Sequence, residues 1–421
     1  MKKITRIQLS TMMFLEFFVW GAWFVTLGTF LINNLNASGA ETGAVFSTQS
    51  WGAIIAPFII GLIADRYFNA EKILGLLHLV GALLMYQMFK APGVAVFYPY
   101  ALGYMILFMP TLALVNSISF NQMEDTEKEF PPVRVWGTIG WIVAGLAISF
   151  VFLWDSPENV KAGLMKNTFL LASIASLVLG LFSFTLPKTP PKVDKGAKVR
   201  ISEILGFDAI KLLKDKNFLI FFIASILICI PLAFYYQYAN PFLIDTGMAN
   251  TTAKMTMGQI FEVFFLLMLP FIFKKFGFKI TIMAGMLAWS VRYALFAYGN
   301  AGDLTFMLII GIILHGICYD FFFVSGQIYT DAKAGPKFKS AAQGLITLAT
   351  YGVGMLIGFE VAGMIKDNYT TTSIVNGVST VVSDWKMIWI IPSGIALLVF
   401  LLFAFIFHDK NEKPITQNLN I

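Results

Sequence analysis

The sequence predicts an all-α integral membrane protein in which about twelve spanning helices form two sets of six. Three observations carry this prediction. Apolar residues make up 57% of the 421 residues, and charged residues only 13%, about half the share usual in a soluble domain. The apolar residues form continuous runs of about 20 residues, which favour spanning helices over a β-barrel. A basic segment near the middle of the chain separates these runs into two groups.

Each run is long enough to cross a bilayer as a helix. The first run follows a basic start but is too long for the apolar region of a cleavable signal peptide, so it is expected to remain as a spanning helix. The expected spans are 10–33, 42–64, 72–92, 95–120, 133–154 and 168–186 in the first set, and 217–243, 255–274, 279–299, 303–327, 340–364 and 386–407 in the second.

The expected organisation is an N-terminal half at 1–186, a linker at 187–216, a C-terminal half at 217–408 and a tail at 409–421. Most of the 30 Lys and Arg residues lie in the linker, the termini and the loops on the same side. This asymmetry places both termini in the cytoplasm of a multi-pass inner-membrane protein. The basic residues then face lipid headgroups, and a nucleic-acid partner is not expected.

Ionisable residues inside apolar spans are costly and therefore indicate function. Glu262 lies in the eighth expected span, one helical turn after Gln259, so the two side chains share a face. An amide and a carboxylate on one face suit a polar solute, and a desolvated carboxylate can hold a proton. A structural hydrogen bond to a neighbouring helix is the alternative.

Asp320 lies among aromatic residues of the tenth expected span, where an unpaired charge is expensive. It is interpreted as a coupling or gating residue, with Arg134 and Arg292 as candidate partners. His315 precedes Tyr319 by one turn, faces much the same way and can hydrogen-bond a solute.

Glu16 in the first span is a further candidate proton site, whereas His78 is interpreted as a packing residue. In the seventh span, Tyr236 and Gln237 lie in a polar and aromatic run that Pro241 is expected to kink. Such a surface suits a sugar or a nucleoside, although an aromatic belt at the membrane interface has the same composition.

Enzyme chemistry has no evident basis in the sequence. The two cysteines, Cys229 and Cys318, lie in apolar runs without metal-ligand spacing, and neither a nucleophile–base set nor an ATP-binding loop is evident. We therefore expect no metal and no organic cofactor, and an ion gradient must supply the energy for transport.

At the end of the second span, three residues separate Gly61 from Asp65, and Arg66 follows directly. This pattern resembles the loop signature of the major facilitator superfamily. The glycine permits close helix packing, and the aspartate can pair in one conformation and be released in another. Asp65 and Arg66 are therefore candidate gating residues.

Further motifs occur in order along nearly the whole chain, at Trp20–Trp23, Thr26–Gly28, Met109–Leu112, Asn116–Ser119, Phe130–Gly140, Arg292–Gly299, Asp320–Phe322 and Ser340–Gly344. Together these segments resemble the bacterial nucleoside:proton symporter family. The resemblance implies a major facilitator fold and nucleoside import driven by the proton gradient.

The family's site residues carry over at the matching motifs. Arg134 and Thr138 lie in the matching stretch of the fifth span, Gln259 and Glu262 match a substrate-contacting pair, and Asp320 matches the family's aspartate.

The sequence departs from the family pattern around the expected solute. Trp141 stands where phenylalanine is typical, and His315 and Tyr319 stand where tyrosine and phenylalanine occur. In the seventh span the expected polar pair aligns with Ala233 and Tyr236, and polar groups reappear at Gln237 and Asn240.

The function expected is nucleoside:proton symport by a monomer, with nucleoside, protons and membrane lipids as partners. Trp141, Tyr236, Gln237, His315 and Tyr319 join the carried-over residues as the expected solute site. A symporter of another polar solute such as a sugar stays open, as does a transporter-like sensor or channel.

Overall fold

The computed structural model describes residues 1–59, 68–191, 207–375 and 378–408. In this part of the chain nine helices are long and apolar enough to cross a membrane. Helix α12 (Thr251–Tyr298) covers two expected spans, because a break at Gly277, with a φ of 76° that favours glycine, separates its two parts. The prediction of an all-α membrane protein is confirmed.

The chain divides into two compact units. The first comprises Met1–Arg200 with Gly247–Thr256, and the second comprises Ile201–Thr246 with Met257–Ile421. Elements of the first unit are α1 (Lys3–Gly21), α2 (Leu27–Thr29), η1 (Phe30–Asn34), α3 (Gly39–Ile59), α4 (Ala70–Lys90), α5 (Val94–Asn121), α6 (Thr126–Glu129), α7 (Pro131–Leu146), η3 (Ala147–Val151), α8 (Pro157–Lys161), η4 (Leu164–Lys166) and α9 (Asn167–Ser183).

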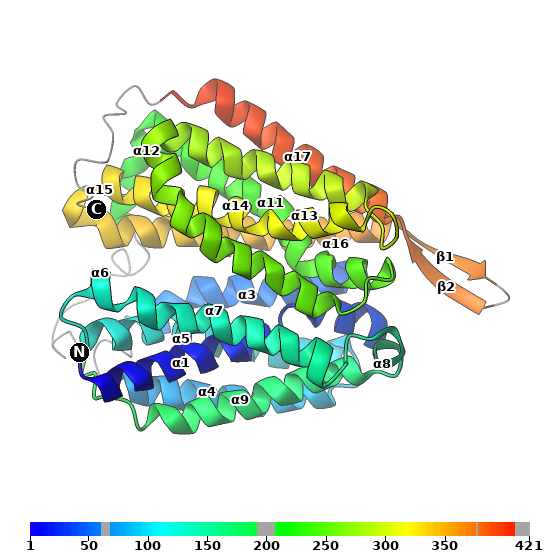
Figure 1. Cartoon of the computed structure of the whole chain (residues 1–421), viewed down its shortest axis with the longest axis horizontal. Helices are drawn as coiled ribbons and strands as arrows, with labels where there is room; N and C mark the ends of the chain where they lie inside the picture. The colour runs from blue at the N-terminus through cyan, green and yellow to red at the C-terminus, as the bar shows by residue number, and fades with distance from the viewer. Residues whose placement is uncertain (60–67, 192–206, 376–377, 409–421) are drawn as a thin grey trace. The chain divides into compact units, whose positions relative to one another are not determined.

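Within the first unit α1 packs along α7, and α4 packs between α5 and α9 (Figure 1). Small residues permit these approaches, as is usual where lipid supplies no hydrophobic drive between helices. Gly140 of α7 lies against the backbone carbonyl of Phe14 on α1, where a larger side chain would collide. Buried Leu9, Met12 and Met13 of α1 belong to the apolar core of this unit.

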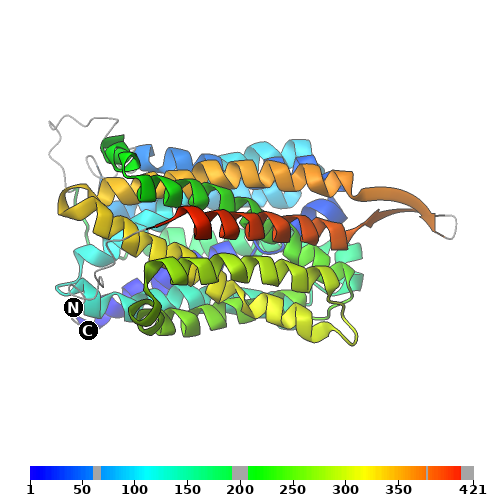
Figure 2. The same ribbon diagram turned by 90° about the horizontal axis from the view of Figure 1, so that it is seen from above.

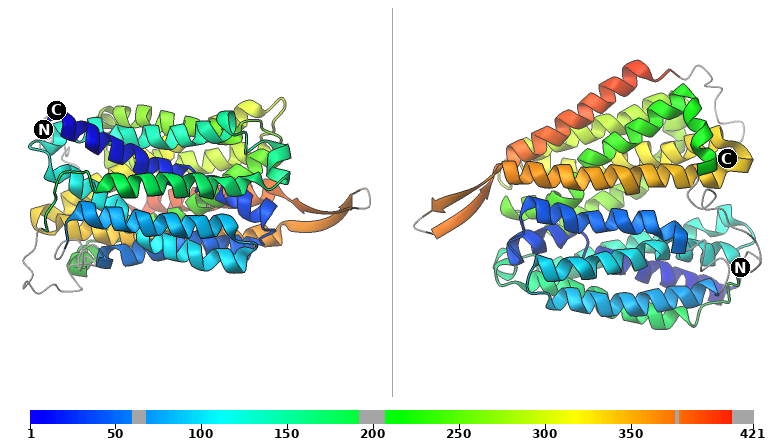
Figure 3. Two further views of the ribbon diagram at one scale, coloured as in Figure 1. Left: turned by 90° about the horizontal axis from the view of Figure 1, so that it is seen from below. Right: turned by 180° about the vertical axis from the view of Figure 1, so that it is seen from behind.

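Elements of the second unit are η5 (Phe207–Lys214), α11 (Lys216–Asp245), most of α12, α13 (Thr305–Ile313), α14 (His315–Tyr319), η6 (Asp320–Val324), α15 (Ser325–Thr347), η7 (Leu348–Gly354), α16 (Met355–Asn368), β1 (Thr370–Val375), β2 (Val378–Ser383) and α17 (Trp385–Ile406). Helix α11 lies between α16 and α17 (Figure 3, right). Helix α11 contains both Pro231 and Pro241 and nevertheless continues from Lys216 to Asp245.

Strands β1 and β2 form an antiparallel hairpin that projects beyond the ends of α16 and α17 (Figure 2). The buried ammonium of Lys366 at the end of α16 donates to Thr370 Oγ1 at 3.0 Å and to Ser383 Oγ at 2.7 Å. This lysine therefore ties both ends of the hairpin to the helix from which it emerges.

The first turn of α12 belongs to the first unit, where buried polar groups cap it. Asp155 Oδ2 accepts from the Thr252 N–H at 2.9 Å, and Ser149 Oγ accepts from the Ala253 N–H at 2.8 Å. The Ser149 hydroxyl in turn donates to Asp155 Oδ2. The negative carboxylate lies at the positive end of the helix dipole.

Asp155→Ala is expected to lower the thermal stability of the protein, because it leaves a buried N–H of α12 without its acceptor. Loss of an N-terminal cap costs about 1–2 kcal/mol. Melting of the purified protein in detergent measures the effect. Asp155→Asn is the matched control, since its amide oxygen can still accept, and equal melting temperatures for wild type and Asp155→Ala would contradict the assignment.

Candidate functional site

A polar cluster lies in the second unit where α14 packs directly on α12. Gly316 makes this possible, because a Cβ at this position would lie 2.7 Å from both the Cα and the backbone nitrogen of Glu262. Gly258 on α12 also permits this close approach, because a Cβ at its position would lie 3.2 Å from His315 Cβ. The two glycines thus bring Glu262 and His315 together.

Four side chains from three helices form the centre of this cluster. His315 Nε2 lies 4.0 Å from Glu262 Oε2, and His315 Nδ1 lies 3.1 Å from Nη1 of buried Arg292. The ring of Tyr235 on α11 stacks on the His315 ring, with centroids 5.1 Å apart, and the Arg292 guanidinium lies 3.6 Å from the Tyr235 centroid. A cation, an imidazole, a carboxylate and an aromatic face thus adjoin one another.

Asp320 lies next to this cluster and is the first residue of the π-helix η6. Its side chain is buried, it interacts electrostatically with Glu262, and its Oδ2 has no hydrogen-bond partner in the described part of the chain. Arg292, one of its two candidate partners, instead donates to His315, and no ion pair joins Arg292 to Asp320 among the described residues. An unpaired buried carboxylate is costly as an ion, which favours a bound proton.

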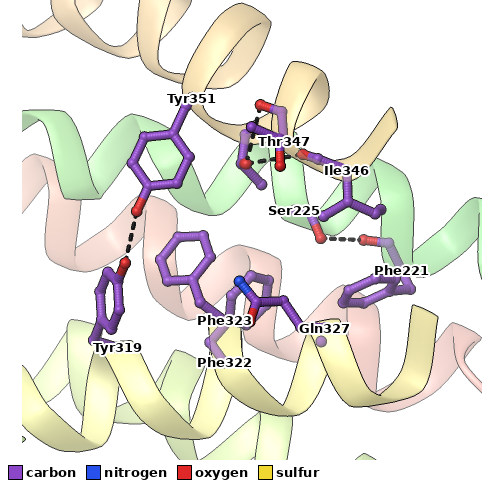
Figure 4. Close-up of a pocket in the computed structure, with 11 residues that line it drawn as sticks. Phe221, Ser225, Tyr319, Phe322, Phe323, Gln327, Ile346, Thr347 and Tyr351 are labelled. Carbon is purple, nitrogen blue, oxygen red and sulfur yellow. Dashed lines mark hydrogen bonds between the residues drawn. The ribbon is translucent and has the colours of Figure 1, made fainter. Parts of the chain in front are cut away.

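A small pocket adjoins the cluster between α11, η6 and η7 (Figure 4). The hydroxyls of Tyr319 and Tyr351 are hydrogen-bonded to one another at 2.7 Å on one side of it. Both residues lie in or next to π-helical segments, which are rare and frequently occur at functional sites. Tyr319 therefore contributes to this pocket as well as adjoining His315.

The other expected residues of the second unit have distinct surroundings. Tyr236 interacts electrostatically with Glu262 and Tyr319 and so belongs to the cluster. Gln259 is half-buried one turn before Glu262, as expected. Gln237 is fully buried and its amide nitrogen donates to the Phe359 carbonyl of α16 at 3.1 Å, so this donor is engaged within the unit.

Arg134, Thr138 and Trp141 lie in the first unit, spaced along one face of α7 and half-buried. The Arg134 guanidinium lies 4.1 Å from the centroid of the Phe17 ring, and the Trp141 ring meets Trp20 edge to face at 5.5 Å. Aromatic residues of α1 therefore orient two of the three expected side chains.

Glu16 lies in a separate, closed network of the first unit. Its Oε2 lies 2.8 Å from His78 Nε2, and its Oε1 accepts from Thr111 at 2.6 Å. Ser176 Oγ lies 3.0 Å from His78 Nδ1 and donates to the His78 carbonyl. All four side chains are buried. His78, interpreted from the sequence as a packing residue, is thus the direct partner of Glu16.

Glu16→Gln is expected to preserve gradient-driven transport. An amide can donate to His78 Nε2 and accept from Thr111, so the network keeps its geometry without an ionisable group. Glu16→Ala is expected to destabilise the protein by about 1–3 kcal/mol for each buried group left without its partner. Uptake and melting curves of both variants measure this. Loss of accumulation in Glu16→Gln with intact exchange would instead assign Glu16 to proton coupling, as the sequence analysis predicts.

Two of the expected gating residues, Asp65 and Arg66, lie outside the described residues. Residues that the sequence analysis did not select are Tyr235, Thr111, Ser176 and Tyr351. Tyr235 lay within the noted aromatic run of the seventh span and Thr111 within the matching segment Met109–Leu112, whereas the isolated Ser176 gave no signal.

Comparisons with known proteins converge on one family. The model of the nucleoside H⁺ symporter family matches residues 2–412. The chain is 41% identical over 97% of its length to YegT of Escherichia coli (strain K12), a protein named for nucleoside transport, covering 95% of it. It is 34% identical to the xanthosine permease of the same organism, with 96% of this chain and 97% of the permease covered.

A solved structure shows the same fold. The crystal structure of the nucleoside transporter NupG superposes with a TM-score of 0.84 at 30% identity, covering 96% of this chain and all of that one. The POT family transporter PepTSo matches with a TM-score of 0.71 at 15% identity, over 96% of this chain and 97% of that chain, a likeness of fold alone.

Proposed function

Because the chain belongs to the nucleoside H⁺ symporter family, we propose that it imports nucleosides across the cytoplasmic membrane together with protons. Membership in this family makes the chain a membrane transporter and not an enzyme. The direction of transport, the coupling and the residues responsible are parts of the proposal.

The observation that supports the proposal most directly is the half-buried carboxylate of Glu262 next to the buried carboxylate of Asp320. Glu262 supplies acceptors for the hydroxyls of a ribose, and the half-buried ring of Tyr236 supplies a flat surface near it. Asp320, buried and without a partner for one oxygen, is the site where a proton binds and leaves. Solute and proton would thus bind at adjacent groups of one unit.

Coupling follows if the two ligands favour different conformations. A ligand shifts a conformational equilibrium only by its difference in affinity for the two states. We propose that the two six-helix halves alternate access to the solute and that Arg134, Thr138 and Trp141 on α7 supply the remaining solute contacts. Both termini would lie in the cytoplasm, and the monomer would be the transporting unit.

Equilibrium binding of labelled uridine to the purified protein in detergent tests the solute assignment. Saturable binding that other nucleosides displace and hexoses do not displace is the expected result. Displacement by a sugar, with no binding of uridine, would keep the fold and overturn the nucleoside assignment.

A further inference from the structure

Arg292 is a buried arginine that the proposed transport cycle does not use. Its guanidinium lies against the ring of Tyr235, and its Nη1 lies 3.1 Å from His315 Nδ1. Neither Nε nor Nη2 has a hydrogen-bond partner in the described part of the chain. The contact with His315 thus engages Nη1, the guanidinium nitrogen that faces the imidazole.

This contact fixes the hydrogen on the imidazole. A guanidinium has donors and no acceptor, so His315 Nδ1 must accept and must carry no hydrogen of its own. The neutral ring then carries its hydrogen on Nε2. In a doubly protonated ring, the Nδ1–H would face the N–H of Arg292 Nη1 at a nitrogen–nitrogen distance of 3.1 Å. The imidazolium would also be a second cation beside the Arg292 guanidinium.

The hydrogen on Nε2 is directed to the side of the ring where Glu262 lies. The distance from Nε2 to Glu262 Oε2 is 4.0 Å, too long for a direct hydrogen bond. One oxygen atom placed about 2.8 Å from each would fit this separation. That oxygen must accept from Nε2–H and donate to the carboxylate, which a hydroxyl does and a carbonyl cannot do.

Glu262 can be reached by a ligand, since its side chain is 29% exposed, whereas that of His315 is only 6% exposed. The stacked Tyr235 ring holds the imidazole plane from one side, and the close packing at Gly316 holds its distance from Glu262. The separation is thus set by the packing of α11, α12 and α14 within one unit.

We propose that His315 and Glu262 form a clamp for a single hydroxyl of the solute, and that Arg292 is the positioning residue that keeps His315 in the Nε2–H form. The proposal rests on the proposed function and deepens it, since it requires a solute with a free sugar hydroxyl.

Competition with deoxynucleosides tests the clamp. Against labelled uridine, either 2′-deoxyuridine or 3′-deoxyuridine is expected to compete at least about 10-fold more weakly than unlabelled uridine does, because a hydrogen bond to a charged group is lost.

In His315→Phe this preference for uridine over the deoxynucleoside is expected to disappear. In His315→Gln it is expected to persist, because the amide oxygen can accept from Arg292 while the nitrogen donates to the hydroxyl. His408→Gln at an exposed position is the control. Equal competition by both analogues in the wild type, or unchanged selectivity in His315→Phe, would overturn the clamp.

The protonation of His315 can be read without transport. The chain has three histidines, so nitrogen-15 spectra of the histidine-labelled protein can be assigned with single substitutions. At neutral pH, His315 is expected to carry no hydrogen on Nδ1 and one on Nε2. In Arg292→Met, this Nε2–H form is expected to be no longer the dominant one. Two protonated nitrogens would overturn the role of Arg292. Because this measurement requires no nucleoside, failure of the proposed solute assignment and failure of the Arg292 role can be told apart.

Discussion

Glu262→Gln is expected to abolish gradient-driven accumulation and to weaken nucleoside binding about 10- to 100-fold. The binding loss follows because a hydrogen bond to a charged acceptor contributes about 1.5–3 kcal/mol, more than a neutral amide restores. Accumulation is expected to fail because the substitution removes the negative charge that interacts electrostatically with Asp320, the proposed proton site.

Binding of labelled uridine and uptake into proteoliposomes measure the two effects separately. Glu360→Gln on α16 is the matched control, because this glutamate is exposed and lies outside the cluster. Wild-type affinity in Glu262→Gln would exclude the carboxylate from the solute site. The backbone contact with Gly316 does not depend on the side chain, so the variant is expected to fold.

Asp320→Asn is expected to separate exchange from accumulation. Asparagine has nearly the shape of a protonated aspartate and no charge, so solute binding and solute exchange across the membrane are expected to persist. The proton that drives accumulation can no longer bind and leave, so concentrative uptake is expected to fall to background.

Counterflow and gradient-driven uptake in the same proteoliposomes distinguish these outcomes. Asp303→Asn in an exposed loop serves as the control. Concentrative uptake at the wild-type level in Asp320→Asn would remove this aspartate from the coupling mechanism. Loss of both activities with intact solute binding would instead indicate a step that the carboxylate itself must complete.

The sequence predicted the helices well where the chain crosses the bilayer without interruption. Expected spans at 72–92 and 95–120 correspond to α4 and α5, and the span at 386–407 corresponds to α17. A lipid environment requires long apolar helices with all backbone groups paired, and this constraint is visible in composition alone.

The interruptions inside helices were not predicted. The expected span at 303–327 is divided among α13, α14, η6 and the start of α15. A π-helical segment depends on which side chains a neighbouring helix presents, and this information is not local in sequence. The hairpin was missed as well, although Thr and Val residues flank an Asn376-Gly377 pair, a recognised signal for a β-hairpin.

The site was predicted in its residue types but not in its pairings. Glu262, His315, Tyr319 and Asp320 were each selected because polar groups are costly in lipid. Whether Arg292 pairs with Asp320 or with His315 depends on how the part of α12 after the break at Gly277 packs on α14, which is not visible in the local sequence. Similarly, Glu16 meets His78 only because α1 and α4 belong to the same bundle.

The most direct test of nucleoside:proton symport is uptake of labelled uridine into proteoliposomes with an alkaline interior, with and without a proton ionophore. Uridine is expected to accumulate above its external concentration, and the ionophore is expected to abolish this accumulation while equilibration persists. Accumulation that the ionophore leaves unchanged would contradict proton coupling, and entry of uridine at the rate of protein-free liposomes would contradict nucleoside transport itself.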